Sequence, residues 1–417
     1  MQMTTPDHNT PHKHATPQAD AHDRHPWQIF RVFLKLGLSA FGGPVAHLGY
    51  FRNEFVQRRQ WLSEHSYADL VALCQFLPGP ASSQVGMALG LSRGGYLGAF
   101  AAWVGFTLPS AFLLMVFAYG MGSFGQWVPA GVLHGLKIVA VAVVAQAVWG
   151  MAKRLCAGVL RTAIMLLVAG AVLLWSSAWV QLLALVVCGA AGMLLFKPDA
   201  SAAQGSSLPV QISRRAGMVW LALFLVLLLG LPVLMQVLPN SRVAQVEAFY
   251  RAGALVFGGG HVVLPLLQAS VVPPGWLSND VFMAGYGAAQ AVPGPLFTFA
   301  AFLGAAMPPD ALPRWANGFL LLLAIMAPSF LLIAGAMPFW EALRSNARMR
   351  AALVGINAGV VGILLAALYH PVWTSAIYRP TDFLLAALAF VVLMFARLPS
   401  WLVVLATGLG GWLLAMW

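Results

Sequence analysis

Two Pro-Gly-Pro tripeptides, at 78–80 and 293–295, have residue types and positions that could form a ligand site. Each lies inside an apolar run, and each follows a glutamine by three residues, Gln75 in the first case and Gln290 in the second. Proline and glycine interrupt the hydrogen-bond ladder of a helix and leave backbone groups without partners. Because an unpaired backbone group is costly in hydrocarbon, these breaks must be packed in protein or must face a polar cavity.

Two glycine-rich tetrapeptides interrupt other apolar runs in the same way: Phe-Gly-Gly-Pro at 41–44 and Phe-Gly-Gly-Gly at 257–260. Glycine lets the backbone approach a ligand because it has no Cβ. A half-helix that begins at such a break presents free N–H groups and the positive end of the helix dipole, which favour an anion. The sequence therefore predicts an anion site at the four breaks.

The predicted substrate-binding residues come from the four breaks, from the two glutamines and from one cation at membrane depth. They are Gly42, Gly43, Pro44, Gln75, Pro78, Gly79, Pro80, Lys137, Gly258, Gly259, Gly260, Gln290, Pro293, Gly294 and Pro295. Two alternatives stay open. The breaks could serve only to kink helices for packing, and the two glutamines could cap broken backbone rather than donate to an oxyanion.

The cation is Lys137, which lies near the middle of the apolar run 128–150, with His134 one turn earlier. A lysine at that depth costs roughly 3 kcal/mol and by default indicates a substrate or coupling site. Snorkelling to an interface is a weaker explanation because Lys137 is about nine residues from either end of the run. Its counterpart in the second half is approximately Asn357, so the two halves would differ chemically.

Other charged or titratable residues flank the broken motifs and could form an electropositive vestibule or carry coupled protons. They are Lys35, Glu54, Asp69, Arg93, Arg251 and His261. Contact with lipid headgroups is an equal alternative for the cations. Glu54 could instead pair with a neighbouring arginine.

The composition indicates that these residues are held in a membrane. The chain has 417 residues, of which 60% are hydrophobic and 8% charged, whereas soluble domains carry about 25% charged residues. Lipid must therefore be the solvent for much of the surface. A net charge of +11 would suggest nucleic acid in a soluble protein, but most cations lie in short segments between apolar runs, where they suit anionic headgroups. We predict contact with the lipid bilayer and none with nucleic acid.

We predict an all-α, polytopic membrane protein with about thirteen hydrophobic segments, arranged as two inverted-topology repeats with broken or re-entrant helices. The predicted parts are a disordered, His-containing cytoplasmic tail at 1–25, a first repeat at 26–196, a cytoplasmic linker at 197–215, a connecting transmembrane helix at 216–238 and a second, inverted repeat at 239–417.

The duplication rests on motifs that recur in the same order in both halves. Besides the four breaks, Trp-Leu-Ser recurs at 61–63 and 276–278, and Pro-Ser recurs at 109–110 and 328–329. A glycine also precedes each tetrapeptide, Gly37 in the first half and Gly253 in the second. An odd number of segments separates corresponding points of the two halves, which inverts the second copy relative to the first.

The loop 51–68 decides how the first broken segments run. It contains Arg52, Arg58 and Arg59, and the positive-inside rule places such a loop in the cytoplasm. A full crossing by 28–50 would put it outside, so we predict that 28–50 and 69–91 are re-entrant hairpins. The matching loop 270–280 has no Lys or Arg, as an external position requires.

The sequence shows little sign of enzyme motifs. The chain has no H-E-x-x-H, Walker or G-x-S-x-G motif. Its three cysteines, Cys74, Cys156 and Cys188, form no C-x-x-C pair, so neither a disulfide framework nor a zinc site is supported. We predict no enzyme activity, no cofactor and no metal site, and ATP-driven pumping within this chain is not expected.

The paired motifs, Phe-Gly-Gly-Pro with Gln-Phe-Leu-Pro-Gly-Pro and Phe-Gly-Gly-Gly with Gln-Ala-Val-Pro-Gly-Pro, resemble those of the chromate ion transporter family. The resemblance covers about residues 28–417 and matches the long, two-domain bacterial type. It implies chromate efflux across the bacterial inner membrane and chromate resistance, with sulfate as a competing mimic. The second half has Gly260 where the first has Pro44, so the two tips need not bind alike.

Electrostatics agrees with export. An interior-negative potential drives a dianion outward by about 4.6 kcal/mol per 100 mV, twice the figure for a single charge. The absence of an ATPase motif favours a secondary transporter driven by the proton gradient. The alternatives are uptake or exchange of sulfate or another tetrahedral oxyanion and, in another class, a membrane enzyme or sensor. The sequence leaves the oligomeric state open, a homodimer included.

Overall fold

The computed structural model describes eleven ranges of the chain, and the statements below concern these residues. The ranges are 25–41, 43–124, 129–175, 178–196, 212–238, 240–257, 260–308, 312–340, 342, 346–396 and 398–416. They form helices and contain no strand, which confirms the predicted all-α, polytopic class. The predicted tail at 1–25 and linker at 197–215 lie almost entirely outside the described residues.

The helices follow the apolar runs, and each run with a predicted break is divided. The first repeat contains α1 (Pro26–Ser39), α2 (Gly43–Phe51), η2 (Arg52–Arg58), α3 (Glu64–Phe76), α4 (Ala81–Phe124), α5 (Ala130–Leu155), α6 (Val159–Leu174) and α7 (Ala178–Leu195). The connecting helix is α8 (Arg214–Val237). The second repeat contains α9 (Ser241–Leu255), η4 (Gly260–Val262), α10 (Val263–Val271), α11 (Asn279–Ala289), η5 (Leu296–Thr298), α12 (Phe299–Ala306), α13 (Arg314–Ala336), η6 (Met337–Phe339), α15 (Ala347–Ala367), η7 (Leu368–Trp373), α16 (Pro380–Val391), η8 (Val392–Ala396) and α17 (Ser400–Leu414).

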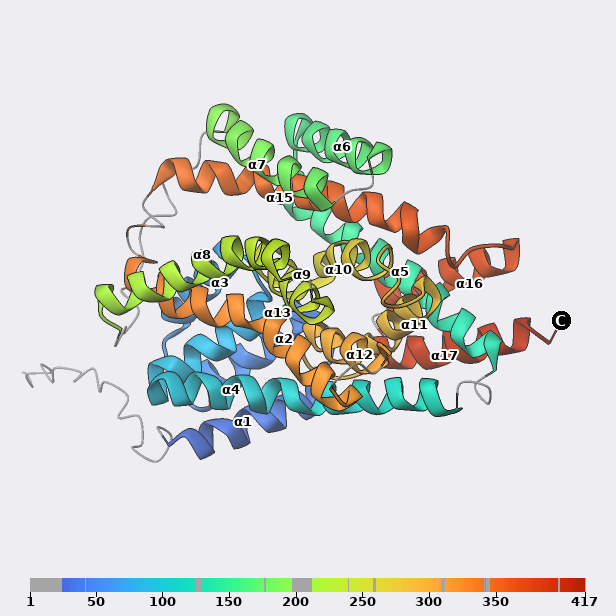
Figure 1. Ribbon diagram of the computed structural model, residues 1–417, viewed down its shortest axis with the longest axis horizontal. Coiled ribbons are helices and arrows are strands. Elements are labelled where there is room, and N and C mark those ends of the chain that lie inside the picture. Colours follow the sequence, from blue (N-terminus) through green and yellow to red (C-terminus); the bar gives the residue numbers. More distant parts are fainter. Residues whose placement is uncertain are drawn as a thin grey trace, which may run out of the picture.

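Five helices are long and apolar enough to cross a bilayer, and the described residues also form shorter apolar helices. The five are Ala81–Met121, Gly131–Leu155, Arg214–Val237, Arg314–Phe339 and Ala347–Trp373. Figure 1 shows the short helices α2, α9, α10 and α12 gathered in the middle, with α1 and α4 on one side and α15, α6 and α7 on the other. In this view, the short helices of the broken segments lie between these two groups.

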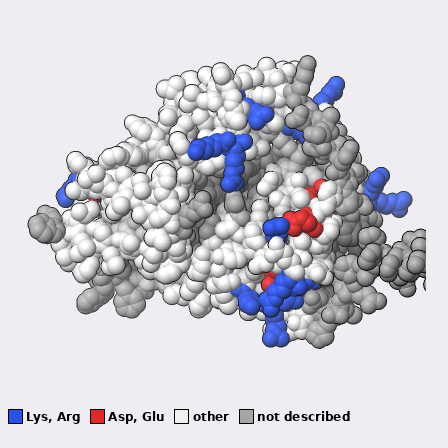
Figure 2. Space-filling model, turned by 180° about the vertical axis from the view of Figure 1, so that it is seen from behind, with Lys and Arg blue, Asp and Glu red and all other residues white. Residues whose placement is uncertain are grey.

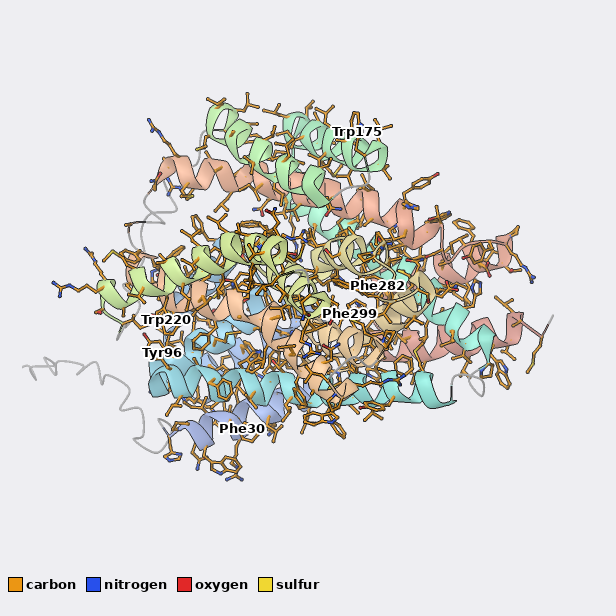
Figure 3. The ribbon with its side chains drawn as sticks, in the orientation of Figure 1. Phe30, Tyr96, Trp175, Trp220, Phe282 and Phe299 are labelled. Atoms are coloured by element: carbon orange, nitrogen blue, oxygen red, sulfur yellow. The ribbon has the colours of Figure 1, made fainter. Side chains whose placement is uncertain are left out.

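The surface has the character of one that lipid covers. Figure 2 shows Lys and Arg gathered at a few places on a largely uncharged face. Gly217 and Phe224 are the buried residues of α8, and the rest of this apolar helix is exposed or half-buried. At one end of α8, the indole N–H of Trp220 donates to the hydroxyl of Tyr96 on α4 (2.9 Å), and the two rings lie together in Figure 3. Aromatic pairs with polar tips are typical of a membrane–water interface.

The divided runs fold back on themselves as hairpins. The ring of Phe33 on α1 is 5.6 Å from that of Phe51 at the end of α2, although a straight helix would separate them by about 27 Å. In the next hairpin, the guanidinium of Arg93 donates to the carbonyl of Trp61 (2.8 Å), which brings the two open ends together. In the second repeat, Phe282 on α11 and Phe299 on α12 are 5.1 Å apart. The chain therefore folds back within 28–50 and between 61 and 93, and the re-entry of these segments into the membrane stays a prediction.

Equivalent helices of the two repeats run in opposite directions. The latter part of α4 and helix α13 carry the matching Pro-Ser motifs, and they lie against each other. Tyr119 near the end of α4 accepts a hydrogen bond from the backbone N–H of Trp315 at the start of α13 (3.1 Å). Phe100, early in this part of α4, lines a groove together with Phe330, late in α13. This antiparallel pairing is the relation that an inverted duplication requires.

The glycine before each tetrapeptide holds two helices together. At Gly37 on α1, a Cβ would lie 2.7 Å from the carbonyl oxygens of Gly105 and Phe106 on α4. At Gly253 on α9, a Cβ would collide with the carbonyl of Ile325 on α13. Small residues allow such close approach of helices in membranes. The matched glycines thus set the same helix contact in both repeats.

Replacing Gly253 with alanine should lower the free energy of unfolding by about 1–3 kcal/mol, because α9 must move away from α13 to admit the methyl group. Gly230 on α8 is a matched control, since a Cβ there meets no atom within 4 Å. The change Gly230→Ala should be neutral or slightly stabilising, as alanine is the better helix former. Thermal unfolding in detergent measures both, and equal behaviour of the two variants would contradict the packing role.

Candidate functional site

Each Pro-Gly-Pro break is hydrogen-bonded to the first broken helix of the opposite repeat. The N–H of Gly79 donates to the carbonyl of Val256 at the end of α9 (2.6 Å), and the N–H of Gly294 donates to the carbonyl of Ala40 at the end of α1 (2.9 Å). Both glycines adopt positive φ, +125° at Gly79 and +98° at Gly294, where other residues are strained. The two reciprocal bonds pair each Pro-Gly-Pro break with the end of the first broken helix of the other repeat.

The Pro-Ser motifs support the same crossed arrangement. The hydroxyl of Ser110 on α4 donates to the carbonyl of Pro293 in the opposite repeat. Ser329 on α13 lies where a Cβ on Gly79 would fall, again across the repeat boundary. On the first repeat's own side, the amide of Gln84 donates to the carbonyl of Pro78 (2.7 Å). Side chains thus satisfy part of the backbone that the breaks leave open.

A cavity of about 450 Å³ lies among these breaks, within the size range of small-molecule sites. Both repeats contribute to its wall. The lining residues are Phe41, Gly43, Pro44, Tyr50, Val143, Gln146, His261, Ala289, Gln290, Val292, Gly294, Leu296, Leu393, Leu398, Pro399 and Ser400. The breaks at 41–44 and 293–295 therefore face a cavity rather than dry packing.

Neutral donors supply the polar part of the cavity wall. The amide nitrogen of Gln290 is buried and has no hydrogen-bond partner among the described residues. The Nδ1 atom of His261 is 2.9 Å from the hydroxyl of Tyr286, and the amide of Gln146 donates to the carbonyl of Leu393 (3.3 Å). The described wall contains no Lys or Arg. An anion here would meet dipoles and N–H groups rather than a full positive charge.

The structure brings five predicted residues to the cavity wall: Gly43, Pro44, His261, Gln290 and Gly294. Pro78, Gly79, Pro80, Pro293 and Pro295 belong to the breaks but do not line the cavity, and Gly260 begins η4 beside it in sequence. Gln75, the counterpart of Gln290, is exposed on α3. Gly42, Gly258 and Gly259 lie outside the described residues. Their part in the site stays a prediction.

Lys137 does not line the cavity. It lies in the second turn of α5, and its ammonium is 3.0 Å from Oδ1 of Asp280 in the first turn of α11. Two to three turns later, Val143 and Gln146 on the same helix do reach the wall. Lys137 is therefore a buried cation outside the cavity, although the sequence predicted that it binds substrate.

The predicted vestibule residues are dispersed, and most have local partners. Arg251 pairs with Glu247 (2.6 Å), and the guanidinium of Arg93 lies 5.2 Å from the centre of the Trp61 ring. Asp69 is 3.8 Å from His65, and Lys35 is exposed on α1. Apart from His261, none of the six lines the cavity.

Glu54 pairs with arginine, which is one of the two roles that the sequence left open for it. Its oxygens are 2.7 Å from Arg59 and 3.2 Å from Arg58. Burial tends to raise the pKa of this carboxyl, but the hydrogen bonds and charges of the two arginines outweigh it, so the pKa of Glu54 is lowered. A carboxylate that stays ionised near neutral pH is poorly suited to carry protons.

Sequence reasoning did not select Gln146 or Ser400, which both line the cavity. Gln146 had a detectable signal, because it is a lone amide within the apolar stretch 138–149. Ser400 had none, since it follows Pro399 at the start of α17 and resembles an ordinary helix-initiating residue.

The fold and its central cavity define a class: a multi-pass membrane transporter built from two inverted repeats with broken helices. More specifically, the chain belongs to the chromate transporter family. The family profile matches residues 27–193 and 243–412, which correspond to the two repeats.

Relatives match the chain over most of its length. It is 28% identical to a chromate transport protein of Pseudomonas aeruginosa, over 93% of this chain and 92% of the relative. It is 27% identical to a chromate transport protein of Cupriavidus metallidurans, over 92% of both chains. An uncharacterized transporter of Methanocaldococcus jannaschii is 27% identical, over 81% of this chain and 82% of the relative. No solved structure matches the chain significantly.

Proposed function

We propose that this protein exports chromate from the bacterial cytoplasm across the inner membrane as a secondary transporter driven by the proton gradient, and that it thereby confers chromate resistance. The observation that carries the proposal is the cavity between the repeats, where the unpaired amide of Gln290 and the Pro-Gly-Pro break at 293–295 meet the Gly43 end of α2. The relatives from Pseudomonas aeruginosa and Cupriavidus metallidurans are named chromate transport proteins, which supports chromate as the substrate.

The chemistry of the wall suits a tetrahedral dianion. Each oxygen of the anion accepts hydrogen bonds, and the wall offers amide groups from Gln146 and Gln290, the hydroxyl of Ser400 and the ring of His261. Neutral donors hold the anion without a charge that would retain it. Because sulfate has the same shape and charge as chromate, we expect sulfate to compete.

The direction follows from the membrane potential, which favours outward movement of a dianion by about 4.6 kcal/mol per 100 mV. In inverted membrane vesicles containing the protein, chromate should accumulate inside when the proton gradient is imposed. Dissipating the gradient should lower the initial rate several-fold. Excess sulfate on the chromate side should also lower it. Empty vesicles and a Gln290→Leu variant are the controls.

Each result has a distinct meaning. An unchanged rate after dissipation would contradict proton coupling but leave chromate transport standing. Accumulation only in right-side-out vesicles would replace export by uptake of a tetrahedral oxyanion. Absence of protein-dependent chromate or sulfate flux in both orientations would overturn the transport function.

A further inference from the structure

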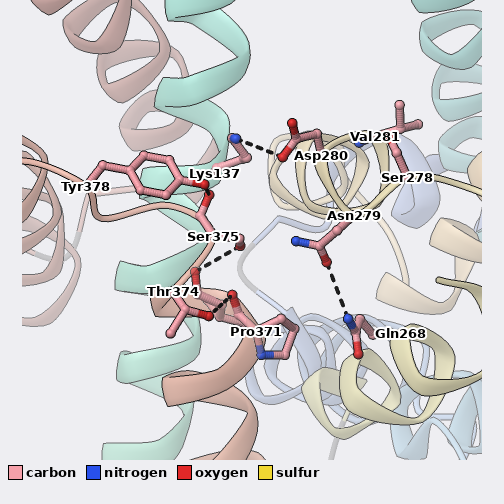
Figure 4. Close-up of polar contacts among 11 residues, drawn as sticks. Lys137, Gln268, Ser278, Asn279, Asp280, Val281, Pro371, Thr374, Ser375 and Tyr378 are labelled. Carbon is pink, nitrogen blue, oxygen red and sulfur yellow. Dashed lines mark hydrogen bonds and ion pairs between the residues drawn. The ribbon is translucent and has the colours of Figure 1, made fainter. Parts of the chain in front are cut away.

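Lys137 is a buried cation whose partner is an exposed carboxylate. Its side chain is 10% exposed, whereas that of Asp280 is 73% exposed, and the two come from opposite repeats (Figure 4). Among the described residues, Asp280 is the one carboxylate within ion-pair distance of this ammonium. Another acid, Asp382, is paired with His134, one turn before Lys137 on α5 (3.0 Å).

An aromatic ring at the protein surface also lies over the Lys137 ammonium. The ammonium is 5.7 Å from the ring centre of Tyr378, which is 63% exposed. The hydroxyl of Tyr378 donates to the carbonyl of Ser375 (2.7 Å), and its ring stacks on His134. Lys137 therefore lies just beneath the protein surface, behind two side chains that are both mostly exposed.

The two members of the ion pair depend on each other unequally. A buried ammonium left without a partner is strongly unfavourable, so Lys137 requires an anion. The exposed carboxylate of Asp280 loses less when it is released, because it is not buried in the pair. Asp280 is therefore an exchangeable partner. A small oxyanion offers the same acceptor oxygens and one more negative charge.

Helix α11 links this place to the central cavity. Asp280 lies in its first turn and Ala289, at its end, lines the cavity wall, a separation of about 13 Å along the helix axis. Between them, α5 and α11 touch at Leu136 and Gly287, where a Cβ on the glycine would strike the carbonyl of Leu136. This contact is closed in the structure, so an anion that leaves the cavity toward Asp280 requires α5 and α11 to separate here before it meets Lys137.

We propose that Lys137 is a second oxyanion site, on the exit route, where the departing substrate displaces Asp280 before it enters the external water. This inference rests on the proposed function for the identity of the substrate. Asp280 then returns to Lys137 and closes the contact between α5 and α11, so the carboxylate competes with external anions for the same ammonium.

The test separates an exit site from an ordinary ion pair by reversing the charges. The double variant Lys137→Glu with Asp280→Lys keeps an ion pair but places a carboxylate at the buried position, where it repels an oxyanion. We expect normal membrane abundance and chromate efflux at least about tenfold below wild type, the equivalent of 1.4 kcal/mol. Wild-type efflux from the reversed pair would show a purely structural contact and would overturn the proposal.

Two single variants test the same site without a reversed ion pair. In Asp280→Asn the competing carboxylate is gone, so external sulfate should inhibit chromate efflux at a concentration at least about threefold lower than in wild type. In Lys137→Gln the same inhibition should require more sulfate than in wild type. Unchanged inhibition in both variants would overturn the proposal.

A binding measurement distinguishes failure of this site from failure of the proposed function. In Asp280→Cys, made without the native cysteines, sulfate or chromate at Lys137 should slow modification of the new thiol by a membrane-impermeant reagent. Protection without any chromate flux would keep the site and reject the export function. Flux without protection would keep the export function and reject the site.

Discussion

Replacing Gln290 with leucine is expected to reduce chromate transport at least about tenfold while leaving the protein folded in the membrane. The amide nitrogen of Gln290 is buried beside the cavity and has no protein partner among the described residues, so its removal breaks no hydrogen bond that stabilises the fold. In the variant, an anion in the cavity loses this donor. A hydrogen bond to a charged group is worth about 1.5–3 kcal/mol. Chromate flux into inverted vesicles, normalised to protein abundance, measures the effect.

Gln75 provides a matched control within the same chain. It has the same place before the Pro-Gly-Pro motif of the first repeat, yet its side chain is exposed on α3 and does not line the cavity. The change Gln75→Leu should leave transport within about twofold of wild type, because an exposed amide makes no buried contact. Equal losses in the two variants would show that both glutamines cap broken backbone and that neither is a specific ligand.

Replacing Gly294 with alanine is expected to destabilise the protein and abolish transport together. This residue has φ of +98°, and an added Cβ would strike the hydroxyl of Ser110 in the opposite repeat. The conformational strain costs roughly 1–2 kcal/mol and the overpacking roughly 1–3 kcal/mol. The loss of transport follows because the N–H of Gly294 would be displaced from the carbonyl of Ala40, which holds the two breaks together.

The control for this change is Gly275, which also has positive φ (+78°) but no atom within 4 Å of the added Cβ. The change Gly275→Ala therefore carries the strain without the clash between repeats. It should lower the melting temperature less than Gly294→Ala and should preserve transport. Full activity in Gly294→Ala would show that the crossed contact does not support the cavity.

The sequence alone determined the features that depend on local chemistry. The apolar runs predicted the helices, because only lipid can solvate so much hydrophobic surface. The breaks at 41–44, 78–80, 257–260 and 293–295 were predictable because clustered prolines and glycines disrupt a helix, whereas a single proline such as Pro109 stays within one. The hairpins were predicted from the arginines in the loop 51–68, and the inversion was predicted from the odd number of apolar segments between corresponding motifs.

Tertiary structure decided which polar groups meet at the cavity. The bonds from Gly79 to Val256 and from Gly294 to Ala40 join residues of opposite repeats, and no local pattern encodes such pairing. The two glutamines have the same sequence context, but only Gln290 reaches the wall, because the two helices that carry them differ in their surroundings.

Lys137 shows the same division. Its depth in an apolar run marked it as functional, since a buried cation is costly wherever it lies. Its partner could not be predicted, because Asp280 is 143 residues away and belongs to the other repeat. Residue type and spacing thus fixed what each group can do, whereas packing between the repeats determined which groups act together.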